Sequence, residues 1–147
     1  MIEKLSTKNA KACAELAHQL WPDADVAEHA ADLMAMIDDK KFTCFLYKSE
    51  DGTYAGFIEM SLRKDYVEGM TSSPVAYVEG IYVVESKRKT GVARALLAAG
   101  EQWGRERGCS EIASDAEIGN EESIGFHKQI GFVEMNRIVC FIKDINS

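Results

Sequence analysis

Three consecutive cations, Lys87, Arg88 and Lys89, lie in mid-chain and are followed closely by Gly91. Residues 75–84, just before them, are rich in β-branched and aromatic side chains, which is typical of a strand. Beyond Gly91 the apolar residues recur at helical spacing. Backbone N–H groups at a helix start attract phosphate, and a glycine lets a ligand approach them closely. The stretch therefore predicts an anion site; the alternative is a solvated basic turn.

The glycine pattern excludes two common phosphate sites. A P-loop needs a Gly-Lys-Ser/Thr sequence after an earlier glycine, and the dinucleotide fingerprint needs three spaced glycines near the first strand. This turn has a single glycine. We expect Thr90 to cap the helix that follows, because threonine is among the side chains that accept hydrogen bonds from a first helical turn.

Glu79 lies inside an apolar run and is the first candidate for proton transfer. Partial desolvation there would raise the pKa of its carboxyl group and make it a better base near neutral pH. The alternative is an edge or salt-bridged glutamate. Gly80 beside it predicts a bulge, which would free the backbone groups of residues 81–83 from the ladder for an extended ligand.

Asp115 is the second candidate, because it follows a short predicted strand, residues 111–114. Ligands of open α/β sheets gather at the carboxyl ends of strands. The alternative is that Asp115 caps a turn. Among the histidines, His127 could donate a proton, although we expect it to pack, and His18 and His29 have no clustered partners and receive no role.

The order of the predicted strands and helices favours an α/β fold, with a mixed central sheet and helices on both of its faces. The expected order is β-α-α-β-β-β-α-β-α-β within one domain, residues 1–147. Strands are expected at 2–5, 42–47, 55–63, 75–84, 111–114 and 133–143, and helices begin near 7, 25, 92 and 121. The strand 55–63 contains Glu59 and Ser61 at alternate positions, so one of its faces is expected to be half wet. The polar and aromatic loop 64–73 is too long for a tight turn and is expected to carry function.

Composition limits the partners. The net charge of -7 argues against nucleic acid and anionic membranes and is compatible with a cationic substrate. Hydrophobic content of 46% fits a globular protein, and the N-terminus lacks the apolar core of a signal peptide. The four cysteines are scattered without a Cys-x-x-Cys pair, so we expect reduced thiols, no metal site and a cytoplasmic location.

Two motifs carry a family resemblance. Arg88-x-x-Gly91-x-Ala93 resembles the pyrophosphate-binding motif of the GCN5-related N-acetyltransferases. The segment from Asn120 to Phe132 is similar to their second motif, with His127 where the family has a tyrosine. With the loop 64–73 and the surroundings of Glu79 and Asp115, most of the chain resembles the chromosomal type of aminoglycoside 6′-N-acetyltransferases.

The resemblance implies roles for individual residues. Acetyl-CoA would be held by the following positions: Ile81, Tyr82, Val83, Lys89, Thr90, Gly91, Val92, Ala93, Arg94 and Asn120. The cationic drug would be held by Trp21, Tyr66, Glu79 and Asp115, with Glu79 and Asp115 as the catalytic carboxylates. Relatives often carry a carboxylate where this chain has Asn136, so the contact made there differs.

Two alternatives to the acetylation of aminoglycosides, the activity that the resemblance implies, stay open. The acceptor could be a polyamine or a protein amine, or the chain could be a non-catalytic acetyl-CoA sensor. The resembling enzymes are typically dimers, and the final predicted strand has an apolar segment, residues 137–142, that could extend a neighbour's sheet. We therefore expect a homodimer.

Overall fold

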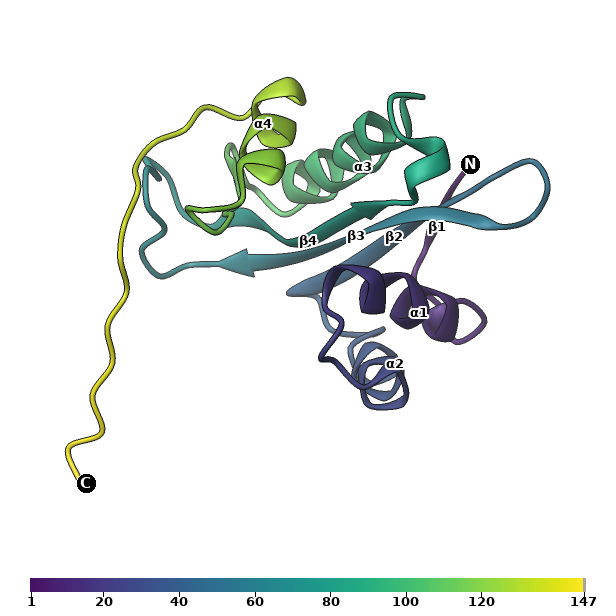
Figure 1. Cartoon of the computed structure of the whole chain (residues 1–147), viewed down its shortest axis with the longest axis horizontal. Coiled ribbons are helices and arrows are strands. Elements are labelled where there is room, and N and C mark those ends of the chain that lie inside the picture. The colour runs from purple at the N-terminus through teal and green to yellow at the C-terminus, as the bar shows by residue number, and fades with distance from the viewer. Residues whose placement is uncertain (147) are drawn as a thin grey trace. The chain divides into compact units, whose positions relative to one another are not determined.

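A computed structural model describes residues 1–146 (Figure 1). It divides the chain into two compact units, which meet between Ser114 and Asp115. Each unit is described by itself. Among the described residues, no helix combines the length and the apolar character needed to cross a membrane.

The first unit is built on a five-stranded mixed sheet in the order β1-β2-β3-β4-β5. Neighbouring strands from β1 to β4 are antiparallel, whereas β5 runs parallel to β4. The strands are β1 (Ile2–Lys4), β2 (Phe42–Lys48), β3 (Tyr54–Arg63), β4 (Val75–Val83) and β5 (Ile112–Ala113). The expected mixed α/β fold is confirmed.

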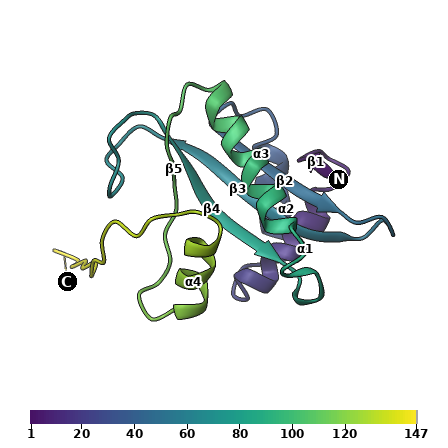
Figure 2. The same cartoon turned by 90° about the horizontal axis from the view of Figure 1, so that it is seen from above.

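Helices cover both faces of this sheet. The α1 (Ala10–Leu20) and α2 (Val26–Ala35) helices lie on one face and α3 (Val92–Glu106) on the other, as Figures 1 and 2 show. Asp25 caps α2 by accepting a hydrogen bond from the Glu28 backbone N–H at 2.9 Å, as its position before the apolar pattern predicts.

Because helices lie on both faces of the sheet, most of β3 is buried on both of its faces. Residues 55–60 are all buried, and Phe57, Ile58 and Met60 are among the largest fully buried side chains. The expectation of a half-wet strand is therefore wrong at Glu59, which is buried with the apolar residues. A buried carboxylate needs a partner, which the site provides.

The second unit contains α4 (Glu121–Gln129) and an extended C-terminal segment. Asn120 caps α4, since its side chain accepts from the Ser123 N–H at 3.0 Å. The strand expected at 133–143 is not formed, and its apolar side chains are exposed, Phe141 by 92%. A strand needs backbone partners and a surface to cover, and the sheet of the described chain ends at β5.

Candidate active site

Strand β4 carries one residue more than the opposite stretch of β3, and this residue is Glu79. Glu59 pairs with Gly80, whereas the next residue of β3, Met60, pairs with Val78. A bulge of this kind bends the strand and redirects a side chain. The bulge predicted at Gly80 is confirmed, and the extra residue is the candidate base itself.

The carboxylate of Glu79 is ion-paired with Arg63, the last residue of β3. Arg63 Nη2 lies 2.8 and 2.7 Å from the two carboxylate oxygens, and its guanidinium is 3.5 Å from the centre of the Tyr77 ring. The Glu79 side chain is 30% exposed. Of the two expectations for Glu79, the structure shows the salt-bridged glutamate, because the Arg63 side chain lies over the Tyr77 ring and reaches the carboxylate.

The turn before α3 has the backbone geometry of an anion site. After the short 3-10 helix η1 (Glu85–Lys87), Lys89 and Gly91 adopt left-handed φ angles of 63° and 90°, with Thr90 between them. Alternating handedness makes successive N–H groups converge, and such a concavity binds anions. A Cβ atom added at Gly91 would meet nothing within 4 Å, so the turn is open to a ligand.

Two side chains of this turn, those of Arg88 and Thr90, donate hydrogen bonds to backbone carbonyls. Gly91, not Thr90, is the N-cap of α3, and no side chain of residues 1–146 caps this helix. The predicted Thr90 cap is wrong, because its hydroxyl donates to the Lys87 carbonyl and stabilises the turn. Arg88 Nε donates to the Val83 carbonyl at 3.0 Å, and its guanidinium lies over the Tyr82 ring.

The backbone of residues 81–83 has one paired and one open edge. Ile81, Tyr82 and Val83 stay in register with β3 beyond the bulge, so the expectation that the bulge frees them from this ladder is wrong. The other edge is open for a different reason: β5 pairs with β4 at Ala76 and Tyr77, and no strand pairing continues past Tyr77 in the described chain. An extended ligand arm could pair along that edge.

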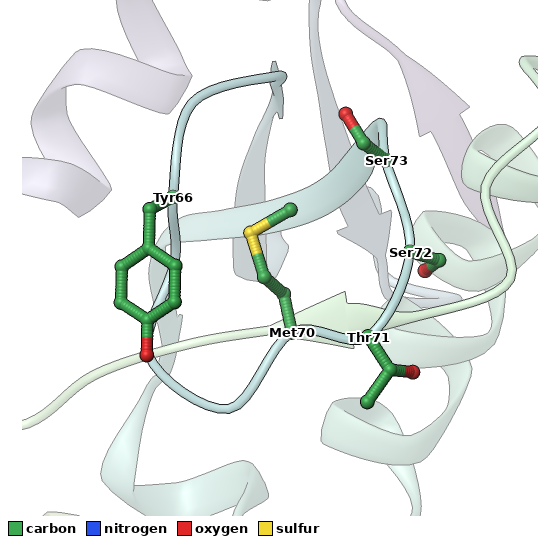
Figure 3. A pocket seen from close by; sticks show the side chains of 5 residues that line it. All are labelled: Tyr66, Met70, Thr71, Ser72 and Ser73. Atoms are coloured by element: carbon green, nitrogen blue, oxygen red, sulfur yellow. The ribbon is translucent and has the colours of Figure 1, made fainter.

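The loop 64–74 between β3 and β4 encloses a shallow hollow of about 510 Å³. Tyr66 stands on one arm of the loop and Ser72 on the other, with Met70 between them (Figure 3). Glu111 anchors the second arm, accepting hydrogen bonds from the Thr71 N–H at 2.8 Å and from the Ser72 hydroxyl, which lower the pKa of its carboxyl group. Tyr66, the candidate drug contact, is 74% exposed beside this hollow.

Trp21 lies directly on the bulge. A Cβ atom added at Gly80 would come within 2.3 Å of the Trp21 ring, so only a glycine admits the indole there. Behind the indole, His29 Nε2 lies 2.8 Å from Glu59 Oε1. The expectation that His29 has no partner is wrong. The sequence did contain a signal for this pair, because Glu59 is a carboxylate within a strand that packing buries and therefore needs a partner.

The second unit holds the remaining predicted residues. Asp115 is exposed and follows β5 closely in the chain, Asn120 caps α4, and Asn136 is exposed in the C-terminal segment. His127 Nδ1 lies 2.7 Å from the Ser123 carbonyl, and its ring contacts that of Phe132 at 5.3 Å. These contacts describe a packed histidine. Within residues 1–146, no group of three His, Cys, Asp or Glu side chains is arranged to hold a metal ion.

A bulged fourth strand that leads through an open turn into a helix, within a mixed sheet covered by helices, is the arrangement of an acetyltransferase fold. The chain belongs to the acetyltransferase (GNAT) family, whose model matches residues 10–132. An aminoglycoside N(6′)-acetyltransferase type 1 from Serratia marcescens is 39% identical over 93% of this chain and 94% of its own. One from Stenotrophomonas maltophilia is 41% identical over 95% and 90%.

Solved structures that are similar to this chain belong to the same class of acetyltransferases. AAC(6′)-Iy in complex with the bisubstrate analog CoA-S-monomethyl-acetylneamine has a TM-score of 0.92 and 35% identity, covering 98% of this chain and 97% of its own. AAC(6′)-Ih from Acinetobacter baumannii has a TM-score of 0.93 and 32% identity, covering 99% and 98%. The overlap with these enzymes includes both units of this chain.

Proposed function

We propose that this chain is an acetyl-CoA-dependent aminoglycoside 6′-N-acetyltransferase and that it confers resistance to these antibiotics. The observation that carries the proposal is the match to relatives named for this activity, at about 40% identity over nine tenths of both chains. The family model covers residues 10–132 and therefore parts of both units, which supports a single acetyltransferase domain.

Acetyl-CoA supplies the activated acetyl group, and two parts of the first unit would hold it. The open edge at Ile81, Tyr82 and Val83 would pair with its extended arm. The N–H groups of residues 89–94 at the start of α3 would bind its pyrophosphate. Asn120 is a further proposed contact. Gly91→Val should weaken acetyl-CoA binding in calorimetry, whereas Gly52→Val, at a similarly left-handed glycine in the β2–β3 turn, should leave it unchanged.

The drug is a polycation, and the proposed acceptor residues suit one. Glu79 and Asp115 would bind its ammonium groups, Trp21 and Tyr66 would cover its rings, and Asn136 would offer a neutral contact. Arg63 shows that Glu79 already holds a cation in the structure.

The reaction then needs two protons removed from the amine and one bond exchanged. An aliphatic amine is largely protonated near pH 7, so Glu79 takes the first proton from it, directly or through water. The nitrogen attacks the thioester carbonyl and an N–H of the open β4 edge stabilises the oxyanion; the C–S bond then breaks, and the second amine proton passes to the departing thiolate, directly or through water. Since the thiolate is a good leaving group and His127 is packed, no dedicated acid is invoked.

We also propose that the enzyme is a cytoplasmic homodimer. Reduced cysteines and a substrate of central metabolism support the location. The apolar side chains exposed along residues 133–142 support the assembly, because a second copy could cover them. Light scattering at micromolar concentration should give twice the mass of one chain; a monomer would contradict the proposal.

The decisive experiment is thiol release from acetyl-CoA with a panel of amines. Aminoglycosides with a 6′-amine should be acetylated, and their counterparts with a 6′-hydroxyl should not. Spermidine and lysine peptides test the alternative acceptors. Turnover with those amines and not with the drugs would move the activity to another acceptor, and no turnover with any amine would leave an acetyl-CoA sensor.

A further inference from the structure

The His29–Glu59 pair, a largely buried contact between α2 and β3, has no part in the proposed chemistry. The His29 side chain is 16% exposed and that of Glu59 is 9% exposed, with 2.8 Å between Nε2 and Oε1. Two ionisable groups are costly to bury, and removing one leaves the other uncompensated. Leu33 of α2 is fully buried, and Val26 and Ala30 of the same helix pack partly buried against the core. The pair adds a directional polar contact between α2 and β3 to this apolar packing.

A chain of contacts runs from this pair to the candidate base. The His29 ring lies 5.9 Å from the Trp21 ring, and the Trp21 ring lies 6.2 Å from Phe57 of β3. The far edge of the indole rests on Gly80. Gly80 is paired in register with Glu59, and Glu79 is the bulged residue next to it. His29, Glu59 and Trp21 therefore surround the bulge from α2, from β3 and from the segment between α1 and α2.

We propose that the His29–Glu59 pair positions the acceptor site by holding Trp21 against Gly80, which fixes both the indole and the bulge that presents Glu79. This inference rests on the proposed function. His29 and Glu59 touch neither the drug nor acetyl-CoA; they act through Trp21 and through the backbone of β4. The chemistry of acetyl transfer does not depend on the charge of His29, but the shape of the drug site does.

The surroundings of His29 favour its charged form. The hydrogen bond to Glu59 raises the pKa of His29, burial opposes this, and the charges of Glu59 and of Asp32 on α2 add to the increase. Cys44 of β2 lies opposite Glu59, and burial raises the pKa of its thiol, so it stays neutral. The geometry of the indole is thus held by an imidazolium–carboxylate contact, which loosens when His29 loses its proton.

The test compares His29→Phe with Leu33→Ala. His29→Phe keeps a ring beside Trp21 but removes the donor to Glu59, and Leu33→Ala destabilises the same helix without touching the pair. Neamine and acetyl-CoA are varied in thiol-release assays on the folded enzymes. We expect His29→Phe to raise the KM for neamine at least about tenfold and to leave that for acetyl-CoA within about twofold, whereas Leu33→Ala changes neither. Equal effects of the two variants on the KM for neamine would overturn the proposal.

Two further variants keep the test decisive if His29→Phe folds poorly. His29→Phe combined with Glu59→Gln removes the uncompensated buried charge and should show the same loss of drug affinity. His29→Gln keeps an N–H donor without a charge and should restore part of it, because the charge-assisted component of the contact is lost. A double variant with the wild-type KM for neamine would show that the pair has a purely structural role.

A fluorescence titration tests the positioning without any activity. Trp103 is replaced by phenylalanine so that Trp21 is the remaining tryptophan; the substitution keeps an aromatic ring at this buried site beside Arg107, and no described residue accepts a hydrogen bond from the Trp103 indole N–H. Because imidazolium quenches a nearby indole, Trp21 emission should rise as His29 deprotonates, and should not do so in His29→Gln. Identical titrations in both proteins would overturn the proposal. If wild type acetylates no aminoglycoside but this titration is seen, the proposed function fails and the positioning stands.

Discussion

Two glutamates on neighbouring strands flank the same bulge and have opposite surroundings. Glu59 of β3 is buried and is paired with His29 of α2, while Glu79 of β4 is half-buried and is paired with Arg63 at the end of β3. Both carboxylates thus meet a basic side chain at hydrogen-bond distance. They differ in exposure and in the element that supplies the partner.

The difference separates a structural ion pair from an exchangeable one. Water screens the Arg63–Glu79 pair, so its net contribution to stability is small, and a drug ammonium can replace the guanidinium. The His29–Glu59 pair is much less accessible to water, with side chains 16% and 9% exposed, so a ligand replaces His29 less readily and the loss of either partner is more costly. Exposure, not the presence of a cation, marks Glu79 as the candidate base.

The largest effect should come from Glu79→Gln, which removes the base but keeps the size of the side chain. We expect kcat for the drug to fall by roughly 10²–10⁴-fold, while the KM for acetyl-CoA stays unchanged. Asp115→Asn should mainly raise the KM for the drug. Steady-state thiol release measures both, and an unchanged kcat in folded Glu79→Gln would remove its role as base.

For the stability of the fold, the buried Glu59 should matter more than the catalytic candidate Glu79. Glu59→Gln breaks a buried charged hydrogen bond and should lower the free energy of unfolding by about 1.5–3 kcal/mol. Glu79→Gln breaks an exposed pair and should cost less than about 1 kcal/mol. Urea unfolding followed by circular dichroism checks both variants. A larger loss for Glu79→Gln would abolish the distinction between the pairs.

Arg63→Gln tests whether the exposed Arg63–Glu79 pair is exchangeable. If the drug's ammonium replaces Arg63, removing this competitor should lower the KM for the drug by about two- to five-fold, the weight of an exposed pair. Lys64→Gln is the matched control, because it removes the same charge from the next residue without that contact. An increased KM in Arg63→Gln alone would mean that Arg63 orients Glu79 for the drug.

The smallest expected effect is the pH dependence of the buried pair. The pKa of His29 is raised in the folded state, chiefly by its hydrogen bond to Glu59. The stability that the pair contributes is therefore complete below about pH 6.5, the ordinary value for histidine, and is lost as pH rises through the folded pKa. The difference in unfolding free energy between wild type and His29→Gln should shrink above pH 6.5; a constant difference would contradict the charged pair.

The sequence by itself determined the parts of the site that are contiguous in the chain. The strand with a bulge at Gly80, the turn with Gly91 and the helix that follows were all readable, because period and glycine placement are local properties. The order of elements through α4 was readable for the same reason. The prediction from local sequence was wrong where a side chain has several possible partners nearby, as for Thr90, which bonds to the Lys87 carbonyl and does not cap α3.

Tertiary structure decided the partners of the glutamates. His29 and Glu59 are 30 residues apart, and Arg63 and Glu79 are 16 apart, so neither pair follows from a local pattern. Covering β3 on both faces buried Glu59, and the antiparallel pairing of β3 with β4 let Arg63 reach Glu79 over the Tyr77 ring. The segment 133–143 has the composition of a strand but remains extended without a ladder, because a strand exists only where another backbone offers hydrogen bonds to it.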